Sequence, residues 1–443
     1  MALMMSVSGI RGLIGQTLTP VLATEAACAF GSHLGRGVVV VGRDSRPSGL
    51  MVSSAVTAGL LSVGCDVVDL GVATTPATAL NVIDAKAIGG MVITASHNPL
   101  PWNGLKFLLA DAIAPPPETA EKIFAAMRAK AFHLASVDSL GKLLSDSTAA
   151  ATHVKKVLTT IPVAAIRDRR FKVVLDSVNG AGGPEGRMLL EELGCTVIQI
   201  NGEPTGQFAH TPEPLAENLT GLCDEVRKQG ADAGFAQDPD ADRLAIVDDR
   251  GRYMGEECTV VLASMQALKE RVGPVAVNLS TSRMIDDVAA RFGARVHRTA
   301  VGEANVARAV VRHNCIIGGE GNGGVIDPRV VHVRDSLVAM ARTLALLADQ
   351  KRSLSAVVDE LPRYAMIKQK FEMDRSSIDK WLGRIRGSDG KGKIDESDGL
   401  RIDWPEGWVH VRPSNTEPIA RIIAEAADAE AAEKLAKRVS DLR

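Results

Sequence analysis

The stretch at residues 94–99, Thr-Ala-Ser-His-Asn-Pro, follows an apolar run and combines residue types that could carry a phosphoryl group. A Ser on a loop held by Asn and Pro after a strand can present its hydroxyl to a cleft as a nucleophile or phosphoryl carrier. The alternative is a turn in which Ser96 and Asn98 only hydrogen-bond to their own backbone.

Residues 238–243, Asp-Pro-Asp-Ala-Asp-Arg, place three carboxylates at alternate positions. In an extended segment alternate side chains point the same way, and three such charges repel one another unless a cation lies among them. Oxygen ligands without His or Cys favour Mg²⁺. We predict a metal site at Asp238, Asp240 and Asp242, against the alternative of an acidic turn exposed to water.

Residues 412–418, Arg-Pro-Ser-Asn-Thr-Glu-Pro, with Arg421 close behind, are suited to binding a phosphate. Arg supplies a bidentate fork, and hydroxyl and backbone N–H groups in a turn form an anion-binding nest. The alternative is a helix start with Ser414 or Thr416 as N-cap, and the two are compatible because helix N-termini bind phosphate.

Residues 318–324, Gly-Gly-Glu-Gly-Asn-Gly-Gly, hold one carboxylate and one amide among five glycines. Glycines let a loop approach a ligand, and Glu320 and Asn322 could accept and donate hydrogen bonds to neighbouring hydroxyls, as a sugar ring requires. Taken alone, such a loop is often only flexible.

The elements that must position these stretches are short β-branched strands, each expected to precede a helical stretch. Strands are predicted at residues 38–41, 67–70, 90–94, 173–175, 196–200, 233–236, 275–279 and 315–318. Strands that alternate with helices form mostly parallel sheets, whose ligands lie beyond the carboxyl ends of the strands.

The alternation of apolar strands with helical stretches also suggests where the units divide. It stops at the prolines 115–117, and an Ala-rich and Lys-rich helical segment is expected from there to about Lys156, while residues 387–397 are expected to form a long solvated loop. Three α/β segments begin near the N-terminus, near Ile166 and near Cys258, and from about residue 365 the pattern differs.

Composition narrows the classes of protein. The 443 residues carry 51 Lys and Arg against 53 Asp and Glu, a net charge of -2, which disfavours nucleic-acid and membrane partners. At roughly 100 to 200 residues per domain the chain holds two to four domains. Six Cys without a CxxC pair, and no apolar run of membrane-spanning length, predict a cytoplasmic protein.

These four stretches in this order resemble the α-D-phosphohexomutase superfamily, whose phosphoserine, metal, sugar and phosphate loops they match. The resemblance covers essentially the whole chain. It implies an α/β fold of four domains around a central cleft, three similar mixed α/β domains and a smaller C-terminal α+β domain. The expected bounds are 1–150, 151–256, 257–364 and 365–443.

The resemblance also implies a reaction. Ser96 would be phosphorylated, Asp238, Asp240 and Asp242 would hold Mg²⁺ with a phosphoserine oxygen, and a hexose 1,6-bisphosphate would act as intermediate and activator. The reacting group would be flanked by residues for charge stabilisation and proton transfer, namely Arg11, His97 and Lys106. Substrate would be bound by Arg243, Gly302, Glu320, Asn322, Arg412, Ser414, Asn415, Thr416 and Arg421.

The chain departs from many bacterial members in its sugar loop, where Gly324 stands in place of a His. This form is similar to an archaeal-type subgroup acting on glucosamine, mannose or glucose phosphates, and glucosamine phosphate is placed first. A metal-dependent phosphatase and a non-catalytic sugar-phosphate binding protein are the alternative classes. The oligomeric state is left open.

Overall fold

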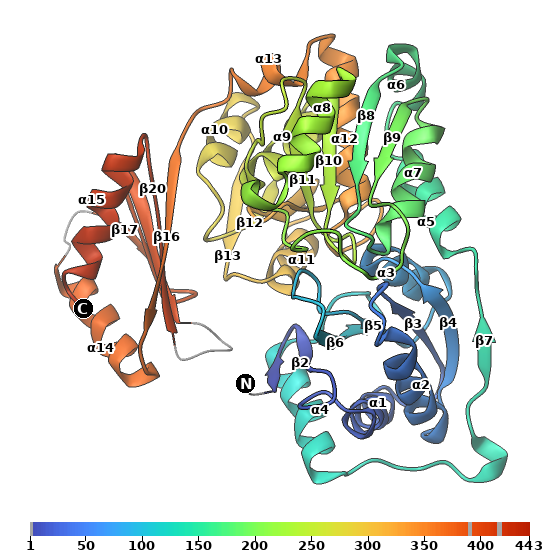
Figure 1. Cartoon of the computed structure of the whole chain (residues 1–443). Helices are drawn as coiled ribbons and strands as arrows, with labels where there is room; N and C mark the ends of the chain where they lie inside the picture. The colour runs from blue at the N-terminus through green and yellow to red at the C-terminus, as the bar shows by residue number, and fades with distance from the viewer. Residues whose placement is uncertain (1–2, 389–391, 414–418) are drawn as a thin grey trace.

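The structure, a computed structural model, describes residues 3–388, 392–413 and 419–443. Its strands form four sheets that follow one another along the chain, each with its own helices. The first unit lies below the second and third in Figure 1, and the fourth stands to the left, joined by the long strand β16 (Ala365–Glu372).

The first sheet has seven strands, with α1, α2 and α4 packed on one face through a core that includes Phe30, Val39 and Ile93. Its strands, in spatial order, are β1 (Met4–Ser6), β2 (Gly9–Leu13), β6 (Trp102–Leu109), β5 (Gly89–Ile93), β3 (Val38–Arg43), β4 (Asp66–Val72) and β7 (Leu143–Ser145). Its helices are α1 (Pro20–Leu34), α2 (Gly49–Ser62), α3 (Thr75–Asp84) and α4 (Pro117–Ala129).

The second and third sheets have four strands each. The second unit comprises α5 (Ala149–Leu158), α6 (Val163–Arg169), β8 (Lys172–Asp176), α7 (Gly182–Glu192), β9 (Thr196–Ile200), α8 (Thr220–Gln229), β10 (Ala233–Gln237) and β11 (Leu244–Asp248). The third comprises α9 (Glu256–Glu270), β12 (Val275–Asn278), α10 (Met284–Arg291), β13 (Val296–Thr299), α11 (Glu303–Arg312), β14 (Ile317–Glu320), β15 (Gly324–Ile326), α12 (Ser336–Gln350) and α13 (Leu354–Val358).

The three sheets share one arrangement. In the second sheet β8 lies parallel between β9 and β10, and β11 pairs antiparallel with β10. The third sheet repeats this with β12 to β15, and strands β3 to β6 repeat it within the first. Each unit therefore contains a four-stranded mixed arrangement in which two consecutive strands form an antiparallel pair, and the first sheet extends it with β1, β2 and β7.

Helix α12 ties the second and third units together. Its residues from Ser336 to Ala348 are all buried, because the sequence is apolar around the whole helix rather than along one stripe. It packs against α9 of its own unit and against α5, α6 and α7 of the unit before. One apolar core consequently spans both units.

The fourth unit is an antiparallel five-stranded sheet covered by two helices. Besides β16 it contains α14 (Arg375–Ser388), β17 (Lys393–Asp395), β18 (Leu400–Trp404), β19 (Gly407–Pro413), β20 (Ile419–Ala426) and α15 (Ala429–Ser440). Its separate core holds Trp381 and Trp404. The four-domain α/β fold implied by the resemblance is confirmed.

Each predicted strand overlaps an observed one, but the expectation that a helix follows every strand is wrong. Strands β5, β10 and β14 are each followed by an antiparallel partner. The helical segment expected to about Lys156 is wrong in part. Helices α4 and α5 occupy its two ends, but α4 stops before the left-handed Lys130 and the chain between them includes β7, paired with β4.

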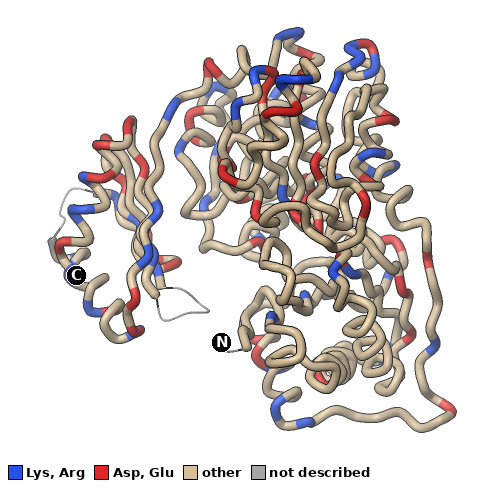
Figure 2. Tube along the Cα trace, viewed as in Figure 1, with Lys and Arg blue, Asp and Glu red and all other residues tan. Residues whose placement is uncertain are grey.

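The solvated loop expected at residues 387–397 is wrong in part. Helix α14 continues to Ser388, and β17 pairs with β18, while residues 389–391 lie outside the described residues. Basic and acidic residues are interspersed along the trace (Figure 2). None of the helices in the described part of the chain has the length and apolar character needed to cross a membrane.

Candidate active site

Three of the predicted stretches occupy equivalent loops. The Ser96 loop joins β5 to β6, the Asp loop joins β10 to β11, and the Glu320 stretch joins β14 to β15. Each loop is thus the connection within the antiparallel strand pair of its unit, β5–β6, β10–β11 or β14–β15. The repeated topology, rather than sequence proximity, brings the three loops together.

Ser96 is held in a strained and specific conformation. Its φ of 49° lies in the left-handed region, which non-glycine residues rarely occupy. Its backbone N–H donates to Thr94 Oγ1 at 2.8 Å, and its own Oγ donates to Asp238 Oδ2 at 2.7 Å. The hydroxyl is therefore directed at the predicted metal loop.

A buried ion pair between Arg46 and Asp44 supports the Ser96 loop. Arg46 pairs with Asp44 at 3.0 Å and donates to the carbonyl oxygens of Ser96 and Asn98, both at 2.6 Å. It also donates to those of Pro99 and Trp102, at 2.9 and 3.0 Å. One guanidinium thus holds four carbonyls of the loop, which a single ammonium could not do.

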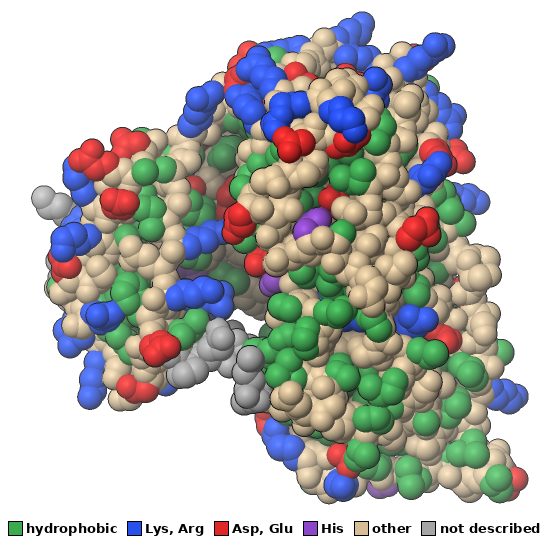
Figure 3. Space-filling model, in the orientation of Figure 1, with side chains coloured by type: hydrophobic (Ala, Val, Ile, Leu, Met, Phe, Trp, Pro, Cys, Tyr) green, Lys and Arg blue, Asp and Glu red, His purple; other side chains and the backbone are tan. Residues whose placement is uncertain are grey.

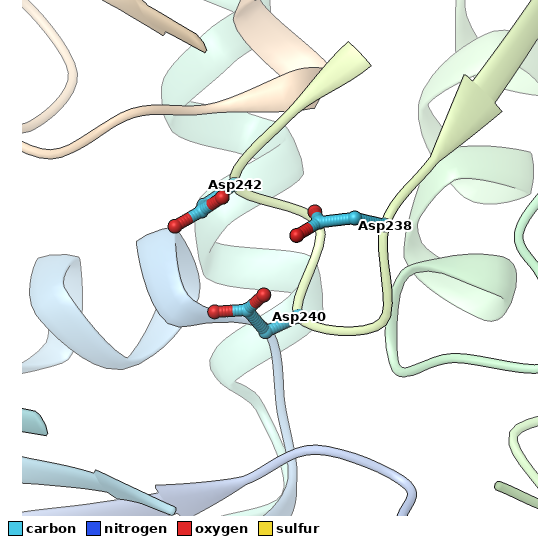
Figure 4. Close-up of side chains that lie close together, drawn as sticks. All are labelled: Asp238, Asp240 and Asp242. Carbon is cyan, nitrogen blue, oxygen red and sulfur yellow. The ribbon is translucent and has the colours of Figure 1, made fainter. Parts of the chain in front are cut away.

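The three Asp carboxylates converge on one space (Figure 4). All three residues are buried, and one oxygen of each lies within 4.8 Å of the others. The segment is a turn, with Ala241 in the left-handed region at φ 56°, and not the extended segment that we assumed. The convergence comes from this turn, so the predicted grouping holds for a different geometric reason.

The Asp loop is docked on the first unit. At the start of α3, the backbone N–H of Thr75 donates to the carbonyl of Asp240 at 2.9 Å, and Thr75 Oγ1 donates to Asp240 Oδ2 at 2.6 Å. Lys106 Nζ lies 2.6 Å from Asp240 Oδ2 and 3.0 Å from Asp242 Oδ2. These contacts fix the loop against the Ser96 side of the site.

The surroundings of the Asp loop shift the pKa values of Asp238 and Asp242 in opposite directions. Burial, with Asp240 and Asp242 beside it, raises the pKa of Asp238 well above its usual range. Burial also opposes ionisation of Asp242, but Arg334 and Lys106 outweigh it, so the pKa of Asp242 lies below its usual range. The loop therefore depends on cations for its ionised form.

The residues present fit a divalent metal. Asp240 Oδ1 and Asp242 Oδ1 are buried and have no hydrogen-bond partner, an arrangement that costs free energy unless a cation is bound. The same carboxylates use their Oδ2 atoms for Lys106, so protein contacts and a metal need not compete for the same oxygen. Among the described residues, only this group of His, Cys, Asp or Glu side chains has such spacing.

Two further predicted residues, His97 and Arg11, contact the Ser96 loop. His97 Nδ1 is 3.3 Å from Ser96 Oγ, and Arg11 Nη1 donates to Asn98 Oδ1 at 2.8 Å. Burial, together with Arg243 and Arg11, lowers the pKa of His97 to about 2. The imidazole is consequently neutral in the ligand-free protein.

A cavity of about 210 Å³, which we call the cleft, opens between the first and third units. From the predicted set it is lined by Arg11, Lys106, Arg243, Gly302, Glu320 and Asn322. Glu320 Oε1 accepts from Asn278 Nδ2 at 2.8 Å and from the N–H of Gly302 at 3.1 Å. The sugar-loop residues therefore face the same space as the residues around Ser96.

The fourth unit faces this region from the other side, across the hollow visible in Figure 3. Arg421 lines a second cavity together with Arg11, His97 and Asn98. Arg412, its antiparallel partner, pairs with Asp398 at 3.1 Å. Ser414, Asn415 and Thr416 lie outside the described residues. The helix start considered at Ser414 or Thr416 likewise lies outside the described residues, and the chain is described again as strand β20 from Ile419.

Sequence reasoning missed three residues that shape the site, Arg46, Thr75 and Arg334. Arg334 Nη1 lies 2.7 Å from Glu320 Oε2, and Nη2 lies 2.6 Å from Asp242 Oδ2. The available signal was an Arg-Asp pair within the apolar run before α12, at residues 334–335. A charge in such a run is buried and needs partners.

Comparison with known proteins decides the family. Four successive regions match the domains of one family, described as phosphoglucomutase/phosphomannomutase: alpha/beta/alpha domain I at residues 3–134, domain II at 151–251, domain III at 254–364, and the C-terminal domain at 357–442. The chain belongs to the phosphoglucomutase/phosphomannomutase family. It is thus a member of the α-D-phosphohexomutase superfamily, as the four loops suggested.

Individual relatives of this family are similar over nearly their whole length. A "Phosphoglucomutase/phosphomannomutase" of Thermococcus kodakarensis is 41% identical, covering 96% of this chain and 94% of the relative. A "Probable phosphoglucosamine mutase" of Methanopyrus kandleri is 38% identical, with 98% and 96% covered. A crystal structure of a family protein from Burkholderia thailandensis superposes with a TM-score of 0.88 at 26% identity, with 99% and 96% covered.

Proposed function

We propose that this protein is a phosphohexomutase, an isomerase that interconverts hexose 6-phosphates and hexose 1-phosphates. The observation that carries the proposal is the contact of Ser96 Oγ with Asp238 Oδ2, at 2.7 Å, beside a carboxylate group with the spacing of a metal site. Family membership supports the same reaction. The proposed domains are residues 1–150, 151–256, 257–364 and 365–443.

In the proposed reaction Ser96 carries a phosphoryl group. The free O6 or O1 hydroxyl of a hexose monophosphate attacks the phosphorus, so that a new P–O bond forms as the bond to Ser96 Oγ breaks. The hydroxyl gives up its proton to the site, and Ser96 Oγ gains one. The resulting 1,6-bisphosphate turns end over end and returns its other phosphoryl group to Ser96.

The chain's own residues divide this work. Asp238, Asp240 and Asp242, with an oxygen of the phosphoserine, would hold Mg²⁺, which neutralises charge on the transferred phosphoryl group when bound. Arg11, which contacts the Ser96 loop, His97, beside Ser96, and Lys106, beside the Asp loop, would stabilise charge and exchange protons. His97 Nδ1, at 3.3 Å from Ser96 Oγ, is placed to exchange the Ser96 proton.

The substrate would lie between the cleft and the fourth domain. The hydroxyls of the sugar ring would be bound by Arg243, Gly302, Glu320 and Asn322. The distal phosphate would be bound by Arg412, Ser414, Asn415, Thr416 and Arg421. Because either end of the sugar must reach Ser96, one fixed phosphate site has to serve both orientations.

Glucosamine phosphate is the proposed first substrate, with mannose and glucose phosphates as alternatives. The "Probable phosphoglucosamine mutase" and "Phosphoglucomutase/phosphomannomutase" names of the relatives support this set. Comparison of kcat/KM for the three hexose phosphates tests the order, since discrimination is measured by that ratio.

Six free thiols support a reducing, cytoplasmic setting.

Ser96→Ala tests the reaction itself. Wild-type protein incubated with hexose 1,6-bisphosphate should gain the mass of one phosphoryl group and isomerise substrate, whereas Ser96→Ala should do neither. Wild-type turnover by this variant would sink the proposal. A metal-dependent phosphatase would instead release phosphate faster than it forms isomer, which the same assay records.

A further inference from the structure

Arg334 lies directly over Gly324, the glycine that ends the sugar loop. A Cβ atom at Gly324 would fall 2.1 Å from Arg334 Cδ and 2.7 Å from Arg334 Cγ. Gly324 belongs to strand β15, and its φ is outside the left-handed region that requires glycine. The glycine is therefore needed for space, and that space is filled by Arg334.

The guanidinium of Arg334 joins two loops from different domains. Nη1 lies 2.7 Å from Glu320 Oε2 of the sugar loop, and Nη2 lies 2.6 Å from Asp242 Oδ2 of the metal loop. The side chain is only 8% exposed, and its Nε is buried without a hydrogen-bond partner. A buried cation is tolerated only with such close partners, so its position is tightly determined.

Neighbouring backbone contacts hold the same junction. The N–H of Leu244, after the metal loop, donates to the carbonyl of Gly323 at 2.9 Å. The N–H of Ser336 donates to the carbonyl of Ala241 at 3.1 Å, and the N–H of Arg334 donates to Glu303 Oε1 at 2.6 Å. The guanidinium thus adds a side-chain link where the two loops already touch.

This link fixes the carboxylate that would read the sugar. Asn278 and Gly302 hold Glu320 Oε1, and Arg334 holds Oε2, so the group is kept in one orientation as a hydrogen-bond acceptor. On the other side Arg334 contacts Oδ2 of Asp242, whereas Oδ1 has no hydrogen-bond partner and lies 3.8 Å from Arg243 Nε. The contact with Arg334 therefore leaves that oxygen available to a metal.

We propose that Arg334 is a positioning residue that sets the distance between the sugar-reading carboxylate of Glu320 and the phosphoryl-transfer loop, and that Gly324 is glycine to admit it. The inference rests on the proposed function. Both orientations of the sugar must bring a hydroxyl to the same phosphoserine, which requires a fixed separation of these two loops. The two Nη atoms of one planar guanidinium hold Glu320 and Asp242 in fixed directions, whereas the ammonium of a lysine is a point charge that does not impose such a geometry.

The test compares Arg334→Lys, which keeps the charge, with Gly324→Ala, which places a methyl group against the arginine. We expect each variant to raise KM for hexose 6-phosphate at least tenfold while kcat, at saturating hexose 1,6-bisphosphate, changes less than threefold. The double variant should lose no more than Arg334→Lys alone, because both changes disturb one contact. Calorimetric titration of the metal-free protein with hexose 6-phosphate should show the same weakening.

Arg342→Lys is the matched control. Arg342, on α12, is a buried arginine like Arg334. It pairs with Asp327 and does not line the cleft. Its KM should stay at the wild-type value. The inference is overturned if Arg334→Lys keeps wild-type KM and affinity, if only its melting temperature falls, or if the effects of Arg334→Lys and Gly324→Ala are additive. Absence of mutase activity in the wild-type protein would refute the proposed function. The calorimetric affinities for hexose 6-phosphate would still test whether Arg334 positions Glu320.

Discussion

Ser96 and Asp238 stand 142 positions apart in the chain and belong to different sheets, yet their side-chain oxygens are 2.7 Å apart. The contact depends on packing between domains, because the start of α3 in the first unit holds the Asp loop through Thr75. The hydroxyl that would carry the phosphoryl group and the carboxylates that would hold the metal therefore form one site only when both units are folded together.

Asp240→Asn should lower turnover roughly 10²- to 10³-fold, the scale of losing one group that stabilises transition-state charge. The change removes the negative charge shared by the two oxygens of Asp240, of which Oδ1 is buried without a hydrogen-bond partner. Turnover at several Mg²⁺ concentrations and a calorimetric Mg²⁺ titration measure the loss. Asp84→Asn, an exposed change at the end of α3, is the control. Wild-type turnover by Asp240→Asn at limiting Mg²⁺ would refute the metal assignment.

Arg46→Lys should impair both stability and turnover, because lysine cannot hold four carbonyls and Asp44 together. Loss of these buried hydrogen bonds should cost about 1–3 kcal/mol in the free energy of unfolding. Urea denaturation measures the stability, and a bisphosphate-primed mutase assay measures the turnover. Arg36→Lys, an exposed change, should alter neither. Full activity in Arg46→Lys would show that the Ser96 loop does not need this support.

His153 should make the stability of the protein depend on pH. It is buried, with Nδ1 2.6 Å from Glu185 and Nε2 2.7 Å from Asp335. Burial disfavours the charged imidazole, but Asp335 and Glu185 outweigh it and raise the pKa of His153 to about 10. In the unfolded chain the pKa is about 6.5. The stabilisation is therefore complete below about pH 6.5 and is lost as the pH rises to about 10.

His153→Gln removes this titration. The variant should be less stable than wild type by roughly 3–5 kcal/mol near pH 6, the cost of breaking a buried ion pair. The difference should shrink as the pH approaches 10. Urea denaturation at pH 6, 8 and 10 measures it, with His33→Gln as an exposed control. A difference that stays constant across this range would contradict the assignment.

Arg421→Ala should raise KM for hexose phosphates by about 10- to 100-fold, since a charge-assisted hydrogen bond contributes about 1.5–3 kcal/mol. Arg421 lines one cavity with Arg11 and His97, so it lies across from the Ser96 loop, on the fourth domain. Steady-state kinetics in both directions measure the effect. Lys434→Ala, on the exposed face of α15, should leave KM unchanged.

Local sequence was enough to predict what depends on residue type and short spacing. The β-branched runs predicted the strands, and the carboxylate and serine stretches indicated which loops carry chemistry. Local sequence did not predict the elements whose formation depends on pairing with distant parts of the chain. Strand β7 forms because residues 143–145 pair with the distant edge of β4, and β6, β11 and β15 follow strands where helices were expected.

The sequence by itself determined the four loops, their order and the family they belong to, because these are properties of neighbouring residues. Only the tertiary structure decided which loops meet and what lies between them. Arg46 and Arg334 show the reason. A buried guanidinium takes its role from the carbonyls and carboxylates that packing brings around it, and those partners lie as far as 92 positions away in the chain.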